Sequence, residues 1–238
     1  MRVADEAAFV LHAIPYKETS LILDVFTRQY GRVALVAKGA KRPHSALRPV
    51  LQRFQPLLIS WSGKTELMTL TKSEWVGGTP ALVGDALLCG FYLNELIVKF
   101  LAREDAHENL FDYYADTLNK LSEETDSLEA ILRPFEARLL RETGFCAALD
   151  YCQETNSRLQ EDVEYVYQPE RGLRPSQVED PDYWPVIMGR DLLNLVAENY
   201  EDSQTLMAGK ILMRFLLGIH LQDQVMTTRK ILIDLKKI

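Results

Sequence analysis

The stretch GRVALVAKGAKRPHSALRPVLQR, residues 31–53, joins a strand-like pattern to the place where this acidic chain turns basic. In its first part Val33 and Leu35 point to one side of a predicted strand, whereas Arg32 and Lys38 share the other side. Side chains alternate in this way only when the backbone is extended. The stretch therefore predicts a strand that passes directly into a positively charged segment.

That positively charged segment is expected to contact phosphates. Residues 39–47 are polar and interrupted by glycine and proline, which predicts a mobile basic loop. The cations that could follow a phosphate backbone, with no acidic residue among them, are Arg32, Lys38, Lys41, Arg42, Arg48 and Arg53. Aromatic side chains that could stack on bases, or equally fill a core, are Tyr16, Tyr30, Phe54 and Trp61.

The period-two pattern extends on both sides of this stretch, from residue 8 to residue 76. Pro15, Gly31 and the tripeptide at 62–64 supply turns between the apolar runs. The predicted strands cover residues 8–14, 20–27, 32–38, 50–61 and 66–76. Five short antiparallel strands in about 70 residues suit a small closed barrel of the OB-fold type.

The sequence Gly77-Gly78-Thr79-Pro80 marks a domain boundary, because two glycines and a proline end strand pairing. We therefore expect an OB-fold domain over residues 1–80 and a mostly helical domain over residues 81–238, an α+β chain. Helical periodicity predicts helices over 81–101, 109–121, 128–143, 190–200 and 205–221, with Gly144 ending the third and Ser203 capping the last.

Two parts of the helical domain are less regular. Pro134 falls inside the third helix, where it either kinks the helix or marks its true start. Residues 146–189 carry four prolines and many acidic residues, which predicts a small irregular insert with one short strand at 165–167.

The charge of the chain is divided unevenly. Its 238 residues have a net charge of −7, yet residues 1–80 hold 11 Lys and Arg against 6 Asp and Glu, a net +5. The remainder holds 16 against 28, a net −12. Such asymmetry suggests one part facing nucleic acid and another facing other partners, although basic loops can also be plain solvated surface.

No catalytic or metal-binding pattern accompanies this charge. The four histidines are scattered, and Gly63-Lys64-Thr65 lies between two predicted strands instead of in a nucleotide-binding loop. Cys89, Cys146 and Cys152 form no CxxC pair, and no apolar run is long enough to span a bilayer. We expect a soluble cytoplasmic protein that is not an enzyme, with no cofactor, small-molecule substrate or membrane partner.

Several strings together resemble the bacterial recombination and repair family RecO. They are AFVLHAIPYKETSLILDVFT, GRVALVAKGAKR, LQRFQPLLISW, FYLNELI, LFDYY and LRPFEARLLRETGF, in the family order over the first two-thirds of the chain. The resemblance implies an OB-fold, a helical domain and a DNA-binding accessory role at the nucleoid. It also implies binding of single- and double-stranded DNA, annealing of complementary strands, and action with RecR to load RecA onto strands coated by single-stranded-DNA-binding protein (SSB).

Two further expectations concern the acidic part. Many relatives hold zinc with four cysteines between the helices, but only Cys146 and Cys152 lie here, so we expect no metal. The acidic, aromatic-ended SSB tail needs an apolar groove rimmed by cations. Arg133 beside Leu132 and Phe135 is the first candidate for that site, ahead of Arg138 and Arg141, although each arginine could simply pair with a neighbouring glutamate.

The alternative function is a non-catalytic scaffold whose OB barrel binds an acidic protein partner. Salt dependence separates the two, because contacts to phosphates release condensed counterions and give a steep loss of affinity.

Overall fold

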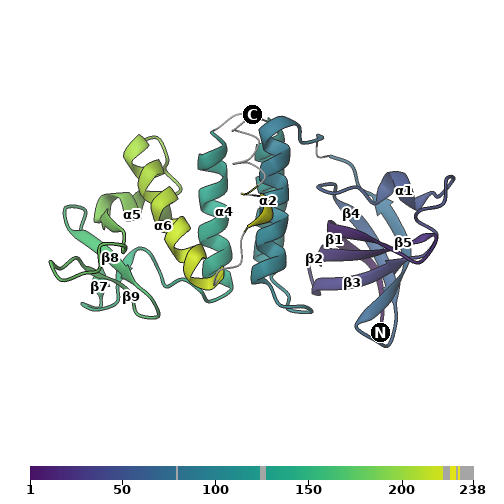
Figure 1. The fold of residues 1–238 in the computed structure, drawn as a ribbon, viewed down its shortest axis with the longest axis horizontal. Coiled ribbons are helices and arrows are strands. Elements are labelled where there is room, and N and C mark those ends of the chain that lie inside the picture. The colour runs from purple at the N-terminus through teal and green to yellow at the C-terminus, as the bar shows by residue number, and fades with distance from the viewer. Residues whose placement is uncertain (79, 124–126, 222–225, 229, 231–238) are drawn as a thin grey trace. The chain divides into compact units, whose positions relative to one another are not determined.

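A computed structural model describes residues 1–78, 80–123, 127–221, 226–228 and 230 (Figure 1). The described residues form two compact units. One contains residues up to 123 together with those from 226 on, and the other contains residues 127–221. No helix within these ranges is both long and apolar enough to cross a membrane.

The first unit is built on a closed five-stranded barrel with the order β1-β2-β3-β5-β4. Its strands are β1 (Arg2–Tyr16), β2 (Ser20–Thr27), β3 (Gly31–Ala37), β4 (Leu57–Ser62) and β5 (Leu67–Trp75). Neighbours are antiparallel except β3 and β5, which pair in parallel and close the barrel. This topology confirms the predicted OB-type barrel.

Alternation along the strands builds the barrel core. Val33 and Leu35 of β3, predicted to share one side of the strand, both belong to the core and pack with Trp61 of β4, whose side chain is fully buried. Two strand starts differ from the prediction by more than one residue. β1 begins at Arg2 instead of residue 8, because its first half pairs with β4. β4 begins only at Leu57, because the chain before it forms a short helix, α1 (Leu47–Val50).

Helices α2 (Gly84–Phe100) and α3 (Glu108–Glu123) belong to the same compact unit as the barrel. The change from strand to helix occurs at the predicted glycine-rich boundary, yet both helices pack with the strands. The reason lies on the outer barrel surface, where Phe9 and Phe26 meet Phe111 and Tyr114 of α3, with ring centroids 5.1–6.1 Å apart. Such an apolar outer face must be covered.

In the second unit, α4 (Leu128–Glu142) and α6 (Ser203–Leu221) pack side by side (Figure 1). The Ser127 hydroxyl accepts a hydrogen bond from Ala130 N at 3.2 Å, so α4 starts at Leu128 and Pro134 lies in its interior. Gly144, with φ 76°, ends it as predicted, since Phe145 N donates to Leu140 O.

The last helix is capped one residue earlier than predicted. Asp202, not Ser203, accepts the first hydrogen bonds of α6: its side chain from Gln204 N at 2.9 Å and its carbonyl from Leu206 N. The helix before it, α5 (Gly189–Val196), ends sooner than the predicted residue 200.

The insert is more regular than predicted. The strand expected at 165–167 is present as β8 (Glu164–Gln168), and it lies between β10 (Val186–Met188) and β9 (Gly172–Pro175) in a three-stranded sheet. A two-stranded hairpin, β6 (Tyr151–Cys152) with β7 (Ser157–Arg158), precedes it.

Candidate nucleic-acid interface

The basic loop after β3 is a chain of hydrogen-bonded turns anchored to the barrel at both ends. Ala40 is buried in the barrel core and Leu47 packs against it. Between these anchors Arg42 N donates to Gly39 O, Ser45 N to Arg42 O and Arg48 N to Ser45 O. The predicted loop thus has a defined shape, with exposed cations at Lys38, Lys41, Arg42 and Arg48.

A second basic position lies next to this loop and was missed from the sequence. Lys41 N donates to Thr19 O at 2.8 Å, which holds the loop against the β1–β2 turn. That turn exposes Lys17, whose Nζ lies 5.2 Å from the centroid of the Tyr16 ring. The signal was available, because in this barrel topology the β1–β2 turn adjoins the β3–β4 connection.

Arg32 is not part of the exposed basic surface. It is 7% exposed, and its Nε and Nη2 donate to the two carboxylate oxygens of Asp24 at 3.2 and 3.0 Å. Its Nη1 donates to the carbonyls of Val98 and Leu101 at the end of α2. Because this guanidinium joins the barrel to a helix terminus, we leave Arg32 out of the proposed DNA-binding set.

The other predicted contacts are divided between core and surface. Arg53 is half-buried, with its guanidinium 5.5 Å from the centroid of the Phe91 ring. Phe54 and Trp61 are buried, and Tyr30 packs edge-on against Trp61 with centroids 5.4 Å apart. These three rings stabilise the barrel unit, and Phe54 also lines an open groove of that unit.

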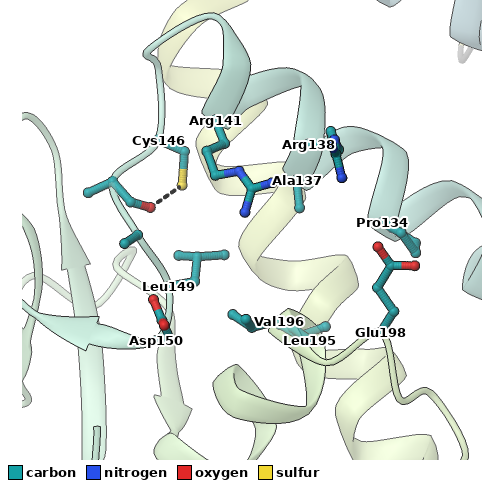
Figure 2. Close-up of a pocket in the computed structure, with 12 residues that line it drawn as sticks. Pro134, Ala137, Arg138, Arg141, Cys146, Leu149, Asp150, Leu195, Val196 and Glu198 are labelled. Atoms are coloured by element: carbon teal, nitrogen blue, oxygen red, sulfur yellow. Dashed lines mark hydrogen bonds between the residues drawn. The ribbon is translucent and has the colours of Figure 1, made fainter. Parts of the chain in front are cut away.

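A separate pocket of about 140 Å³ lies in the second unit (Figure 2). Its cationic side is formed by Arg138 and Arg141 of α4, and its apolar side includes Leu149, Leu195 and Val196. Arg138 Nε also lies 3.5 Å from Glu142 Oε1, the helical pair considered from the sequence.

A thiol and two carboxylates also line the pocket. Cys146 donates from its thiol to Ala147 O at 3.1 Å, and burial raises the pKa of this thiol to about 11. The thiol is therefore protonated and unreactive near neutral pH. Two carboxylates, Asp150 and Glu198, also line the pocket.

The residue trio expected at a partner site lies on another face of α4. Arg133 Nη1 pairs at 2.7 Å with Glu136, which is fully buried, and Phe135 and Leu132 are buried as well. None of the three lines the pocket. Helical spacing explains the difference, because residues 134, 137, 138 and 141 share a face that residues 132, 133 and 135 do not.

The two cysteines near the insert are buried free thiols. Within the part of the chain that the structure describes, no three His, Cys, Asp or Glu side chains gather as a possible metal site.

Comparison with known proteins places the chain in a family. Residues 1–79 match the family described as "Recombination protein O N terminal", and residues 82–185 match "Recombination protein O C terminal". A DNA repair protein RecO of Polynucleobacter asymbioticus is 71% identical, over 100% of this chain and 99% of the relative. One of Cupriavidus pinatubonensis is 56% identical, over 98% and 80%. The chain belongs to the RecO family of DNA repair proteins.

Proposed function

We propose that the barrel unit binds single- and double-stranded DNA through the surface formed by Lys17, Lys38, Lys41, Arg42 and Arg48, with Arg53 at its edge. The observation that supports this most is the hydrogen bond from Lys41 N to Thr19 O, which holds the basic loop of an OB-type barrel against the turn that exposes Lys17. Exposed cations on turns with no acid between residues 31 and 53 suit a phosphate backbone and are indifferent to base sequence.

Strand annealing follows from the same electrostatics. Two complementary strands repel each other through their phosphates, and a basic surface that neutralises both lowers this repulsion while leaving base edges free to pair. The process needs neither a nucleotide cofactor nor a catalytic side chain. In this role the protein acts in the cytoplasm at the nucleoid and, with RecR, helps load RecA onto SSB-coated single strands.

The pocket of the second unit is the proposed site for the acidic SSB tail. Arg138 and Arg141 supply cations for the tail carboxylates, and Leu149, Leu195 and Val196 supply apolar surface for its aromatic end. Asp150 and Glu198 would repel a misplaced carboxylate, so they favour one direction of the peptide in the pocket.

The DNA proposal is tested by fluorescence anisotropy of a labelled single strand across a salt series. We expect Lys38→Glu/Lys41→Glu/Arg42→Glu to bind more weakly and to lower the slope of log affinity against log salt by about 2, since each lost contact removes about 0.7 on a single strand. The matched control, Arg158→Glu/Arg171→Glu/Arg190→Glu, changes net charge equally at exposed positions of the second unit. Equal behaviour of the two variants would favour a scaffold that binds an acidic protein.

The tail proposal is tested with an acidic peptide that ends in phenylalanine. We expect Arg141→Ala to weaken its binding about tenfold or more, because a charge-assisted hydrogen bond contributes about 1.5–3 kcal/mol. Arg133→Ala is the control: it should leave peptide affinity unchanged and lower stability, since it removes the ion pair that Arg133 makes with the buried carboxylate of Glu136. Loss of binding in Arg133→Ala with none in Arg141→Ala would move the site back to the face predicted first.

A further inference from the structure

An open groove of the barrel unit, of about 510 Å³, shares only Arg53 with the proposed phosphate contacts. It lies between the end of the basic stretch, the end of β5 and the start of α2. Its walls include Val50, Arg53, Trp75, Leu82 and Phe91. Its volume falls in the range of small-ligand clefts, about 300–1,000 Å³.

Trp75 is the unusual member of this groove. It is the last residue of β5 and is 59% exposed, although an indole of this size gains stability from burial. Its Nε1 donates to Gln55 Oε1 at 3.0 Å, which restrains the ring. A restrained, exposed aromatic face is the kind of platform on which an unstacked base is held.

The charge of the groove points to the same ligand. Among the described residues that line it, Arg53 is the one with a charged side chain, and no carboxylate is present. Its guanidinium lies 5.5 Å from the Phe91 ring centroid, and Phe91 is braced edge-on by Phe54 at 5.1 Å. Cation and aromatic walls together fit a planar, electron-rich group attached to an anion.

The groove is continuous with the basic surface. The residues leading into the groove belong to α1, which exposes Arg48, and they follow directly on the loop that exposes Lys38, Lys41 and Arg42. A strand whose phosphates follow these cations would bring a nucleotide to the groove.

We propose that this groove is a nucleobase subsite, in which Trp75 stacks on a base of single-stranded DNA and Arg53 contacts the same nucleotide. The inference rests on the proposed function, because it requires the strand to be held by the basic segment. A duplex cannot use the groove, since its bases are paired and stacked. The groove therefore gives the barrel unit a preference for single strands that phosphate contacts alone do not give.

The test compares three DNA probes of equal length: an oligothymidine strand, a strand of abasic sites, and a duplex. We expect Trp75→Ala to lower affinity for oligothymidine about tenfold, the effect of losing one stacked base, and to leave the abasic strand and the duplex unaffected. Trp75→Phe should retain most of the affinity and Trp75→Leu should not, because an aromatic face is required. Binding of oligothymidine should also quench tryptophan fluorescence in wild type and not in Trp75→Phe.

The outcomes separate this inference from the proposed function. If wild type binds all three probes and Trp75→Ala binds them with unchanged affinity, the base subsite alone is overturned. A protein segment would then be the expected occupant of the groove. An equal loss for the abasic strand would overturn the base subsite as well, because the defect would then concern phosphates. Wild type that binds none of the probes would overturn both proposals. The Lys38→Glu/Lys41→Glu/Arg42→Glu variant should lose affinity for all three.

Discussion

At the scale of single residues, the arginines of the basic stretch serve different purposes. Arg32 has three carbonyl or carboxylate partners inside the barrel unit, whereas Arg42 is exposed on a turn and Arg48 is exposed on α1. Sequence alone could not separate them, because Asp24 and the end of α2 approach Arg32 only in the folded chain. A basic side chain at the start of a strand is equally compatible with both environments.

Arg32→Gln is expected to destabilise the barrel unit by about 3 kcal/mol, because it removes the guanidinium shared by two helix carbonyls and the Asp24 carboxylate, which keeps only its longer contact with Arg103 at 3.4 Å. The measurement is urea unfolding followed by tryptophan fluorescence in a Trp184→Phe background, so that the signal comes from Trp61 and Trp75 of the barrel unit. Arg48→Gln, at an exposed site, is the matched control and should cost little. An unchanged stability with reduced DNA affinity would return Arg32 to the DNA-binding set.

Glu95 is expected to make the stability of the first unit sensitive to acid. Burial opposes its ionisation, but hydrogen bonds from Thr228 N at 2.9 Å, Thr227 N at 2.7 Å and the Thr228 hydroxyl outweigh it and lower the pKa of Glu95. A lowered pKa in the folded state means that the stabilisation is complete above the ordinary value of 4.5 and is lost as pH falls through the folded value.

Glu95→Gln should therefore cost about 2 kcal/mol at neutral pH, the worth of a hydrogen bond to a charged group. The difference from wild type should stay constant down to about pH 4.5 and shrink below it. Urea unfolding at a series of pH values measures this. A difference that grows on acidification would contradict the assignment.

At the scale of elements, the β2–β3 turn shows how tightly the barrel meets the segment before α3. Gly31 adopts φ 63°, and a Cβ there would lie 2.0 Å from the Asp105 carbonyl oxygen. The adjacent hydrogen bond from Glu104 N to Arg32 O, at 2.9 Å, holds the backbone around Asp105 close to the β2–β3 turn, so it cannot easily move away from an added Cβ.

Gly31→Ala is accordingly expected to be among the most damaging single-methyl changes, lowering stability by several kcal/mol through combined strain and clash. Gly77→Ala is the control for backbone conformation alone, since its φ is 86° and a Cβ there meets nothing within 4 Å. Thermal unfolding of the two variants separates the effects. Equal melting temperatures would show that the contact with Asp105 is unimportant.

The elements also show how far sequence reasoning reaches. Alternation identified all five barrel strands because their inner faces are uniformly apolar, and helical periodicity located the long helices. It missed α1, which is four residues long and contains Pro49, and it missed the strands beside β8, which are too short to carry a period. It placed the tail site at Leu132 and Phe135, which are buried in the core, and so did not find the pocket on the other face of α4 that we propose instead.

At the scale of the whole molecule, the two proposed binding sites lie in different compact units. The basic loop and the groove belong to the barrel unit, and the pocket of Arg138 and Arg141 lies within residues 127–221. Sites that share no side chains are expected to contribute independently to binding.

We therefore expect Arg141→Ala to leave the salt dependence of DNA binding unchanged, and the triple charge reversal at Lys38, Lys41 and Arg42 to leave peptide affinity unchanged. In the combined variant, the loss of DNA affinity and the loss of peptide affinity should each equal the loss in the corresponding single-site variant, within about 0.5 kcal/mol. Titrations of DNA and of peptide, each repeated with the other ligand saturating, measure this. A coupling energy above 1 kcal/mol would show that the units communicate.

The aromatic seam, the contact of Phe9 and Phe26 on the barrel with Phe111 and Tyr114 of α3, determines where the protein can be truncated. A fragment cut at the glycine-rich boundary would carry every barrel strand, yet it would present two phenylalanine rings and the Arg32–Asp24 pair to water. Such a fragment is expected to self-associate, whereas one extended through α3 keeps the seam closed. The smallest portable piece that keeps the proposed DNA-binding surface is therefore expected to be the barrel together with its two helices.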